Sequence, residues 1–283
     1  MSMLEDRFPK MRVLITGATS GFGEALAYQL AARGWKVAVT GRKLDAVQRT
    51  AAEVTRRGGT GLGLSLEVRE KSQWQAIRQT LKEAWGGIDV LVNNAGVADA
   101  NQMVNMSDEA WESVLSTNLH GVINGCRTYV PDMIEAQSGY ILNVASIAGL
   151  LSMPEMANYS VSKAGVISLS ETLNTELSAA HIGVTVLCPS GFKSSLFEKA
   201  ARDGRDATEA RVSGRVVQKD MDKGTHTSET VAAYALKAIE RGWLYSIPQP
   251  MYKLFWIAKR LMPNTFYNLI GWMYRNKFGP FSG

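Results

Sequence analysis

Short apolar segments alternate along the chain with longer segments whose apolar residues recur at helical spacing. The short segments are rich in β-branched residues and predict strands at 12–15, 37–40, 62–66, 88–92, 140–144 and 184–188. The longer segments predict helices over 24–33, 44–57, 71–85, 108–129 and 159–180. This alternation is typical of βαβ units around a parallel sheet.

The predicted strands are apolar almost throughout, as expected of a parallel sheet that helices cover on both faces. We therefore expect an α/β fold, a Rossmann-like doubly wound parallel sheet of about seven strands flanked by helices on both faces. After Cys188 come a polar, charged stretch over 198–227, one more helix over 228–241 and an aromatic tail. We expect residues 1–250 to form the Rossmann-type domain and residues 251–283 to form an aromatic, basic, helical extension.

Composition narrows the class of protein. The 283 residues, 46% of them hydrophobic, suffice for one core. Cys126 and Cys188 lie far apart in apolar segments, and no apolar run approaches the roughly 20 residues that a membrane-spanning helix needs, so we expect a cytoplasmic, reducing setting. The net charge of +5 comes from scattered cations, which argues against a nucleic-acid partner and suits anionic cofactor phosphates.

A glycine-rich turn follows the first predicted strand. Glycines in such a turn allow backbone angles closed to other residues and let the main chain approach a pyrophosphate at the start of a helix. A tight turn without a ligand is the alternative. We interpret the turn as a nucleotide site whose contacts are Gly17, Thr19, Ser20, Gly21, Phe22 and Gly23.

The second predicted strand ends at Thr40-Gly41-Arg42-Lys43, with no acidic residue. An acid there would bond a ribose 2′-hydroxyl and repel a 2′-phosphate, whereas Arg42 and Lys43 can hold the phosphate. A solvated basic loop is the alternative. We predict NADP(H) as the cofactor.

Tyr159 and Lys163 stand four residues apart in a helical pattern, so their side chains share one face. A nearby ammonium favours the phenolate and lowers a tyrosine pKa from about 10 toward the neutral range. Ser146 follows the strand 140–144, at the sheet edge where such folds bind ligands, and its hydroxyl can hold a substrate oxygen. Taken singly, each residue has an ordinary alternative. Tyr159 could be a residue of an amphipathic helix, Lys163 a solvated charge and Ser146 a helix or turn cap.

Taken in order, the motifs resemble the single-domain branch of the short-chain dehydrogenase/reductase family over roughly residues 11–247. The resemblance implies that Tyr159 exchanges a proton with the substrate oxygen during hydride transfer and that Ser146 holds this oxygen. It also implies that Lys163 binds the nicotinamide ribose and that Asn118 supports a water relay behind Lys163.

The resemblance implies further cofactor contacts. Glu67 and Val68 stand where the family has an acid near the adenine, and Asn94, Ala95 and Gly96 flank the adenosine, with Asn93 in support. After the sixth strand Ser190 replaces a family glycine, and Ser194 stands in for a threonine that binds the carboxamide. The contacts implied in addition to the glycine turn and the two cations are Glu67, Val68, Asn94, Ala95, Gly96, Tyr159, Lys163, Pro189, Gly191 and Ser194. The three histidines lack ligand-spaced partners, so we expect no catalytic metal.

The leading hypothesis is a carbonyl reductase or alcohol dehydrogenase for a small-molecule, apolar substrate. A 3-oxoacyl thioester reductase is the alternative within the family. A cofactor-sensing regulator without turnover is the alternative of another class, against which the complete set of Asn118, Ser146, Tyr159 and Lys163 argues. We expect a homodimer or a homotetramer.

The tail from Met251 predicts two helices, separated by Pro263, that are rich in aromatic and basic residues. Leu254, Ile257 and Leu261 fall on one helical stripe. The favoured interpretation is that the tail packs on the body or on a neighbouring subunit, as a lid over the pocket or an oligomer contact. Peripheral contact with an anionic membrane is the alternative.

Overall fold

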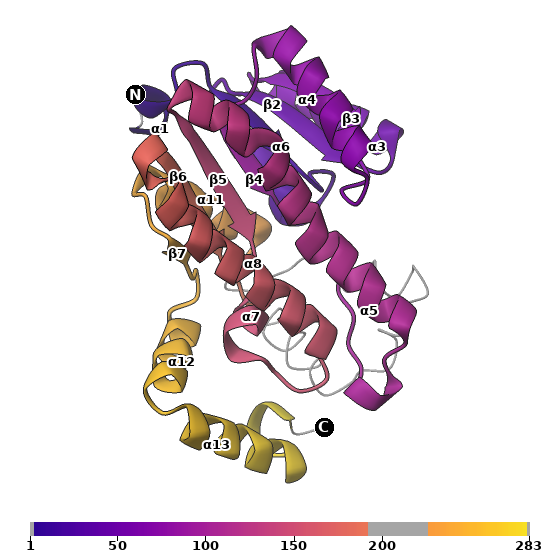
Figure 1. The fold of residues 1–283 in the computed structure, drawn as a ribbon, viewed down its shortest axis with the longest axis vertical. Coiled ribbons are helices and arrows are strands. Elements are labelled where there is room, and N and C mark those ends of the chain that lie inside the picture. The colour runs from indigo at the N-terminus through magenta and orange to yellow at the C-terminus, as the bar shows by residue number, and fades with distance from the viewer. Residues whose placement is uncertain (1–2, 192–225, 282–283) are drawn as a thin grey trace.

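The computed structural model describes residues 3–191 and 226–281, which contain a seven-stranded sheet in the order β3-β2-β1-β4-β5-β6-β7 (Figure 1). All its strand pairs are parallel. The chain builds the sheet outward from β1 to β3, then returns to the centre and builds outward from β4. The order therefore reverses between β1 and β4, which confirms the predicted fold class. The strands are β1 Arg12–Ile15, β2 Lys36–Gly41, β3 Thr60–Ser65, β4 Val90–Asn93, β5 Gly139–Val144, β6 Ile182–Leu187 and β7 Tyr245–Ser246.

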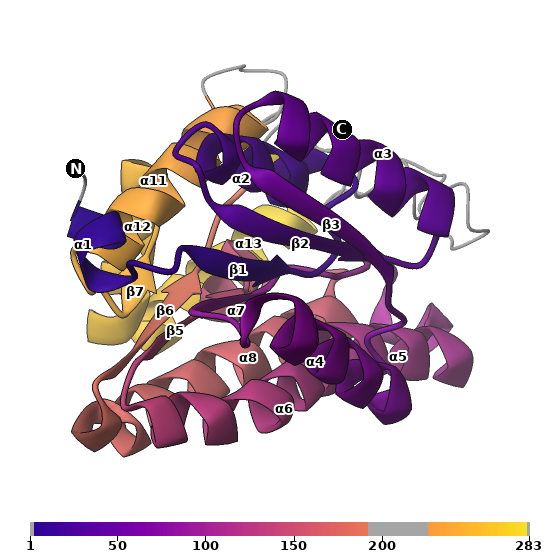
Figure 2. The same ribbon diagram turned by 90° about the horizontal axis from the view of Figure 1, so that it is seen from above.

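Helices cover both faces of the sheet (Figure 2). One core cluster joins the sheet to α2 Gly21–Ala31, α3 Leu44–Arg56 and α11 Ser228–Glu240. The cluster on the other face includes α4 Lys71–Trp85, α6 Gly121–Ala136 and α8 Ala157–Glu176. Shorter elements are α1 Met3–Arg7, η1 Met103–Asn105, α5 Asp108–Leu115, η2 Ser116–His120, α7 Ile147–Leu151, η3 Ser178–Ala180 and η4 Gly279–Phe281.

The edge strand β3 departs from the prediction that every strand is apolar and buried on both faces. Its residues are half-buried or exposed. A Cβ on Gly61 would lie 2.0 Å from the Ala51 carbonyl oxygen, and one on Gly63 would lie 2.7 Å from that of Val47. The backbone of α3 thus leaves room only for glycine at positions 61 and 63, so β3, Thr60–Ser65, lacks a continuous apolar pattern and differs in its bounds from the predicted 62–66.

The prediction of one helix over 108–129 is also wrong in detail. A π-helical turn, η2, separates α5 from α6, and the Gly121 N–H donates to the carbonyl of Ser116. Such single π-helical turns are frequent at functional sites. Here the π-helical turn contains Asn118.

The tail follows β7 and forms α12 Pro250–Leu261 and α13 Pro263–Arg275. Both helices lie at the end of the molecule that carries α7, below the carboxyl ends of the strands in Figure 1. In the part of the chain that the structure describes, no helix has the length and apolar character needed to cross a membrane.

Candidate active site

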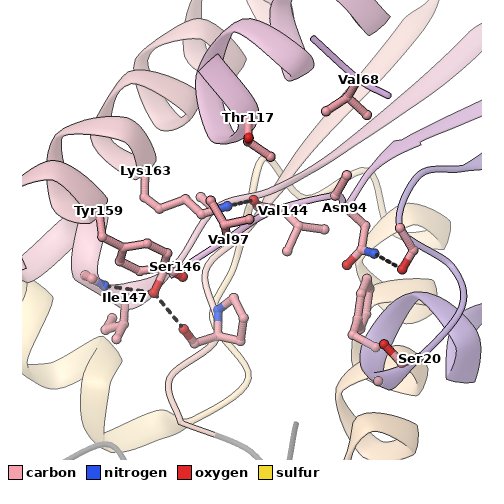
Figure 3. Close-up of a pocket in the computed structure, with 18 of the residues that line it drawn as sticks. Ser20, Val68, Asn94, Val97, Thr117, Val144, Ser146, Ile147, Tyr159 and Lys163 are labelled. Atoms are coloured by element: carbon pink, nitrogen blue, oxygen red, sulfur yellow. Dashed lines mark hydrogen bonds between the residues drawn. The ribbon is translucent and has the colours of Figure 1, made fainter. Parts of the chain in front are cut away.

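A pocket lies at the carboxyl ends of the strands, beside the point where the strand order reverses, which is where ligands bind in doubly wound folds. Its wall brings together segments that are distant in sequence (Figure 3). Of the residues predicted to bind cofactor or substrate, the pocket is lined by Gly17, Thr19, Ser20, Gly21, Phe22, Arg42, Glu67, Val68, Asn94, Ala95, Gly96, Ser146, Tyr159, Lys163, Pro189 and Gly191. Gly23, Lys43 and Asn118 are not part of this wall, and Ser194 lies outside the described residues.

The glycine turn is held in place by Asn94. Its side-chain amide donates to the carbonyls of Thr16, at 2.7 Å, and Gly17, at 3.1 Å, while its backbone N–H donates to the Thr16 hydroxyl at 2.9 Å. Gly17 and Gly21 have φ angles of 64° and 59°, a region that side chains disfavour. The turn is therefore fixed before any ligand binds.

Gly23 has a packing role beneath this turn. A Cβ at this position would lie 2.5 Å from the Asn94 amide nitrogen and 2.9 Å from the Gly17 carbonyl oxygen. Gly23 therefore lets α2 pack closely against Asn94 and the turn that Asn94 holds, although Gly23 is not part of the pocket wall.

Charged residues cluster at the end of the pocket formed by β2 and β3. Arg42 is exposed and lines the pocket, whereas Lys43 is the N-cap of α3. Glu67 forms an ion pair with Arg69 at 2.9 Å. Burial opposes ionisation of Glu67, but the hydrogen bonds from Arg69 and the charge of Arg42 hold its pKa below the ordinary value.

Ser146, Tyr159 and Lys163 meet at the opposite end of the pocket. Ser146 is the N-cap of α7, where its hydroxyl accepts from the Ala148 N–H at 3.2 Å. Tyr159 and Lys163 extend from one face of α8, as their spacing predicted, and the Lys163 ammonium donates to the Val144 carbonyl at 2.8 Å (Figure 3). Ser146 is thus both a helix cap and a residue of the pocket.

The structure does not show the expected lowering of the Tyr159 pKa by Lys163. Burial raises the pKa of Tyr159, and the hydrogen bond with Ser146 only partly opposes that change. Burial also lowers the pKa of Lys163 to about 8. The ammonium lies 5.8 Å from the centre of the tyrosine ring and bonds to a carbonyl instead of the phenol. In this arrangement Tyr159 keeps its proton at neutral pH and can donate it.

Asn118 is buried behind the pocket wall. Its carboxamide accepts from the Val97 N–H at 2.8 Å and donates to the Val97 carbonyl at 2.9 Å and to the Ser162 hydroxyl at 3.2 Å. Ser162 in turn donates to the Tyr159 carbonyl at 2.7 Å. The side chain therefore connects the loop after β4 to the helix that carries Tyr159.

The pocket also contains residues that sequence reasoning missed. Thr117 and Val97 face it beside Asn118 and Gly96, and nearness to those motifs was the available signal. Met153 and Met156 also line it and were not missed, because the sequence places them in the segment 150–156 that we expected to shape the substrate site. Tyr252 reaches the pocket from α12, and the motifs gave no sign of it.

Comparisons with known proteins agree with this geometry. A family model described as short chain dehydrogenase matches residues 11–205. The 3-oxoacyl-[acyl-carrier-protein] reductase of Staphylococcus epidermidis is 33% identical over 224 residues, which cover 78% of this chain and 90% of that protein.

Solved structures show the same fold. A short chain dehydrogenase/reductase from Burkholderia phymatum, in complex with NAD, is 31% identical, with a TM-score of 0.81 and coverage of 89% of this chain and 94% of that one. A short-chain dehydrogenase from Sphingobium yanoikuyae, in complex with NADPH, is 25% identical, with a TM-score of 0.72 and the same two coverages, 89% and 94%. The two similar structures thus hold different nicotinamide cofactors.

Proposed function

Because the chain belongs to the short-chain dehydrogenase/reductase family, we propose that it moves a hydride between NADP(H) and a carbonyl or secondary alcohol of an apolar organic substrate. One observation carries the proposal. Ser146, Tyr159 and Lys163 share a pocket with a turn whose glycine angles and close backbone packing suit a pyrophosphate.

The chemistry follows from the positions of these groups. Bound NADPH supplies the hydride. During reduction the Tyr159 hydroxyl gives its proton to the carbonyl oxygen, so that one hydride and one proton convert the carbonyl to an alcohol. Ser146 donates a hydrogen bond to that oxygen, and Lys163 holds the ribose. The apolar side chains of Leu151, Met153 and Met156 favour an apolar substrate.

The preference for NADP(H) rests on Arg42. It stands at the pocket where β2 ends, and the nearby carboxylate of Glu67 is paired with Arg69. We expect Arg42→Ala to weaken NADPH binding at least tenfold, because a hydrogen bond to a charged group contributes about 1.5–3 kcal/mol, and to leave NADH binding nearly unchanged. Dissociation constants for both cofactors, from fluorescence titration, measure this.

Lys43→Ala is the matched control, because it removes the same charge from a neighbour that does not line the pocket. We expect it to change NADPH affinity less than Arg42→Ala does. Equal weakening of NADPH and NADH by Arg42→Ala would show that Arg42 does not hold the 2′-phosphate.

The pKa of Lys163, about 8, predicts that cofactor affinity depends on pH. The ammonium is the form that attracts the anionic cofactor and donates to the ribose, and it loses its proton as the pH rises through this value. NADPH should therefore bind most tightly below about pH 8 and progressively less tightly above it. Isothermal titration of the wild type with NADPH between about pH 7 and 9.5 measures how affinity changes with pH. Lys163→Met should bind NADPH weakly, with an affinity that does not change over this range. A wild-type affinity that is constant across this range contradicts the prediction.

A 3-oxoacyl thioester reductase is the second candidate, because the Staphylococcus epidermidis relative is named as one. A panel of aliphatic, aromatic, steroid-like and acyl-thioester carbonyls, each tested with NADPH and NADH, separates the candidates. Selective turnover of the 3-oxoacyl thioester would establish the second. Binding of NADPH without turnover of any carbonyl would instead favour the cofactor-sensing regulator and contradict the proposal.

A further inference from the structure

The C-terminal tail, residues 250–281, attaches to the body through one set of side chains. Tyr252, Trp256 and Phe266 pack against the core, and the Trp256 ring lies 4.8 Å from that of Tyr245. The Tyr267 hydroxyl donates to the Leu151 carbonyl at 2.9 Å. These contacts fix the tail beside α7 and the pocket, as the favoured interpretation expected.

The predicted apolar stripe of α12 faces away from these contacts. Leu254 is 66% exposed and Leu261 is 75% exposed. On α13 Leu269 and Trp272 are more than 40% exposed, and Phe278 follows them. Single exposed apolar residues are ordinary, whereas large exposed apolar patches mark sites of interaction with proteins, membranes or ligands. We call this set the outer face of the tail.

Exposed apolar side chains also lie on η1, next to α13. Met103 is 60% exposed and Val104 is 87% exposed. Gln102, just before them, donates to the Tyr274 hydroxyl at 3.3 Å, so η1 lies against α13. In Figure 1 the tail and the segment that contains η1 lie at the same end of the molecule.

The charged residues of the tail are all of one sign. Residues 250–283 contain five cations, Lys253, Lys259, Arg260, Arg275 and Lys277, and no Asp or Glu. The whole chain has 31 Lys and Arg against 26 Asp and Glu, so the tail accounts for the entire net charge of +5 and the rest of the chain is balanced. Helices with Trp, Phe and Leu on one side and cations beside them are suited to the interface of a bilayer.

We propose that the outer face of the tail binds the surface of an anionic lipid bilayer, with the apolar side chains inserted and the exposed cations Lys253, Arg260, Arg275 and Lys277 against the headgroups. Lys259 instead donates to the Leu150 carbonyl and helps to attach α12 to the body. Interfacial helices lie along the bilayer, so the short α12 and α13 are long enough. Charge favours this occupant over a second copy of the chain. Two-fold pairing of the outer faces would oppose the cations of one tail to those of the other, without a carboxylate in either tail to pair with them. Because Tyr252 lines the pocket, binding would hold the active site close to carbonyl compounds dissolved in the lipid.

The test is sedimentation of the full-length protein with vesicles of phosphatidylcholine alone or mixed with phosphatidylglycerol. It needs neither substrate nor turnover, so its result is independent of the proposed enzyme activity. We expect binding to the mixed vesicles, weakened by salt, and little binding to the neutral ones. Leu254→Ser with Leu261→Ser should lower partitioning roughly a hundredfold, and Lys253→Gln with Arg275→Gln should lower it roughly thirtyfold.

Two control variants match these changes. Ile134→Ser removes an exposed apolar side chain from α6, outside the tail, and Lys71→Gln with Lys237→Gln removes two exposed cations from α4 and α11. Both should bind vesicles as the wild type does. Equal binding to neutral and mixed vesicles, or equal losses in control and tail variants, would overturn the proposal. So would light scattering that shows Leu254→Ser with Leu261→Ser dissociating an oligomer in the absence of lipid, because the outer face would then be a subunit contact.

Discussion

Replacing Tyr159 by phenylalanine is expected to remove nearly all turnover while the fold and cofactor binding persist. The ring, which is 7% exposed, stays in the same pocket, and only the hydroxyl that donates the proton is lost. A positioned acid contributes about 10²–10⁴-fold to the rate, so we expect a loss of roughly a thousandfold in kcat. The measurement is NADPH oxidation with the best carbonyl of the substrate panel, alongside the NADPH dissociation constant and the thermal midpoint.

Tyr129→Phe is the matched control for this change. Tyr129 is also buried, but it belongs to α6 and packs against Trp74 of α4, and within the described residues its hydroxyl has no hydrogen-bond partner. Removing that hydroxyl should leave kcat unchanged and stability the same or slightly higher. If Tyr159→Phe keeps the activity of Tyr129→Phe, another group supplies the proton and the proposed mechanism is wrong.

Features that depend on neighbouring residues could be predicted from the sequence. The spacing of Tyr159 and Lys163 fixes their common helix face, and a glycine turn between strand and helix fixes the site of backbone approach. The position of Ser146 at the ligand-binding edge was predicted for the same reason, since it lies two residues after a strand of a parallel sheet. Each inference needed only the local geometry of one element and the rule that strand ends meet at one edge.

Features that depend on distant segments could not be predicted in this way. Burial raises the Tyr159 pKa, and the ammonium of Lys163 does not bond to the phenol, because its partner is the Val144 carbonyl, nineteen residues away. Tyr252 enters the pocket because α12 packs beside α7, where Lys259 donates to the Leu150 carbonyl. The apolar stripe of α12 is a similar case. The spacing of Leu254, Ile257 and Leu261 did not reveal that Tyr252 and Trp256, on the other side of the helix, make the contacts with the body.

The π-helical turn is a further case, and it leads to the second large effect. Replacing Asn118 by leucine should destabilise the protein and impair catalysis together. The change keeps the size of the buried side chain but leaves the Val97 N–H and carbonyl unpaired in the interior. At about 1–3 kcal/mol for each of these two unpaired groups, we expect a loss of roughly 2–6 kcal/mol in the free energy of unfolding. Urea denaturation gives this quantity.

Asn124→Leu separates the positioning role of Asn118 from its contribution to stability. Asn124 is also a buried asparagine, 6% exposed, and its amide donates only to the carbonyls of Val68, at 3.1 Å, and Arg69, at 3.4 Å. Within the part of the chain that the structure describes, the Asn124 side chain makes no hydrogen bond to α8, whereas Asn118 reaches Tyr159 through Ser162. We therefore expect both variants to lose stability, but only Asn118→Leu to lose kcat, by roughly tenfold or more, when both are assayed well below their unfolding midpoints. If the two variants retain equal kcat, Asn118 supports the fold alone and has no part in positioning the tyrosine.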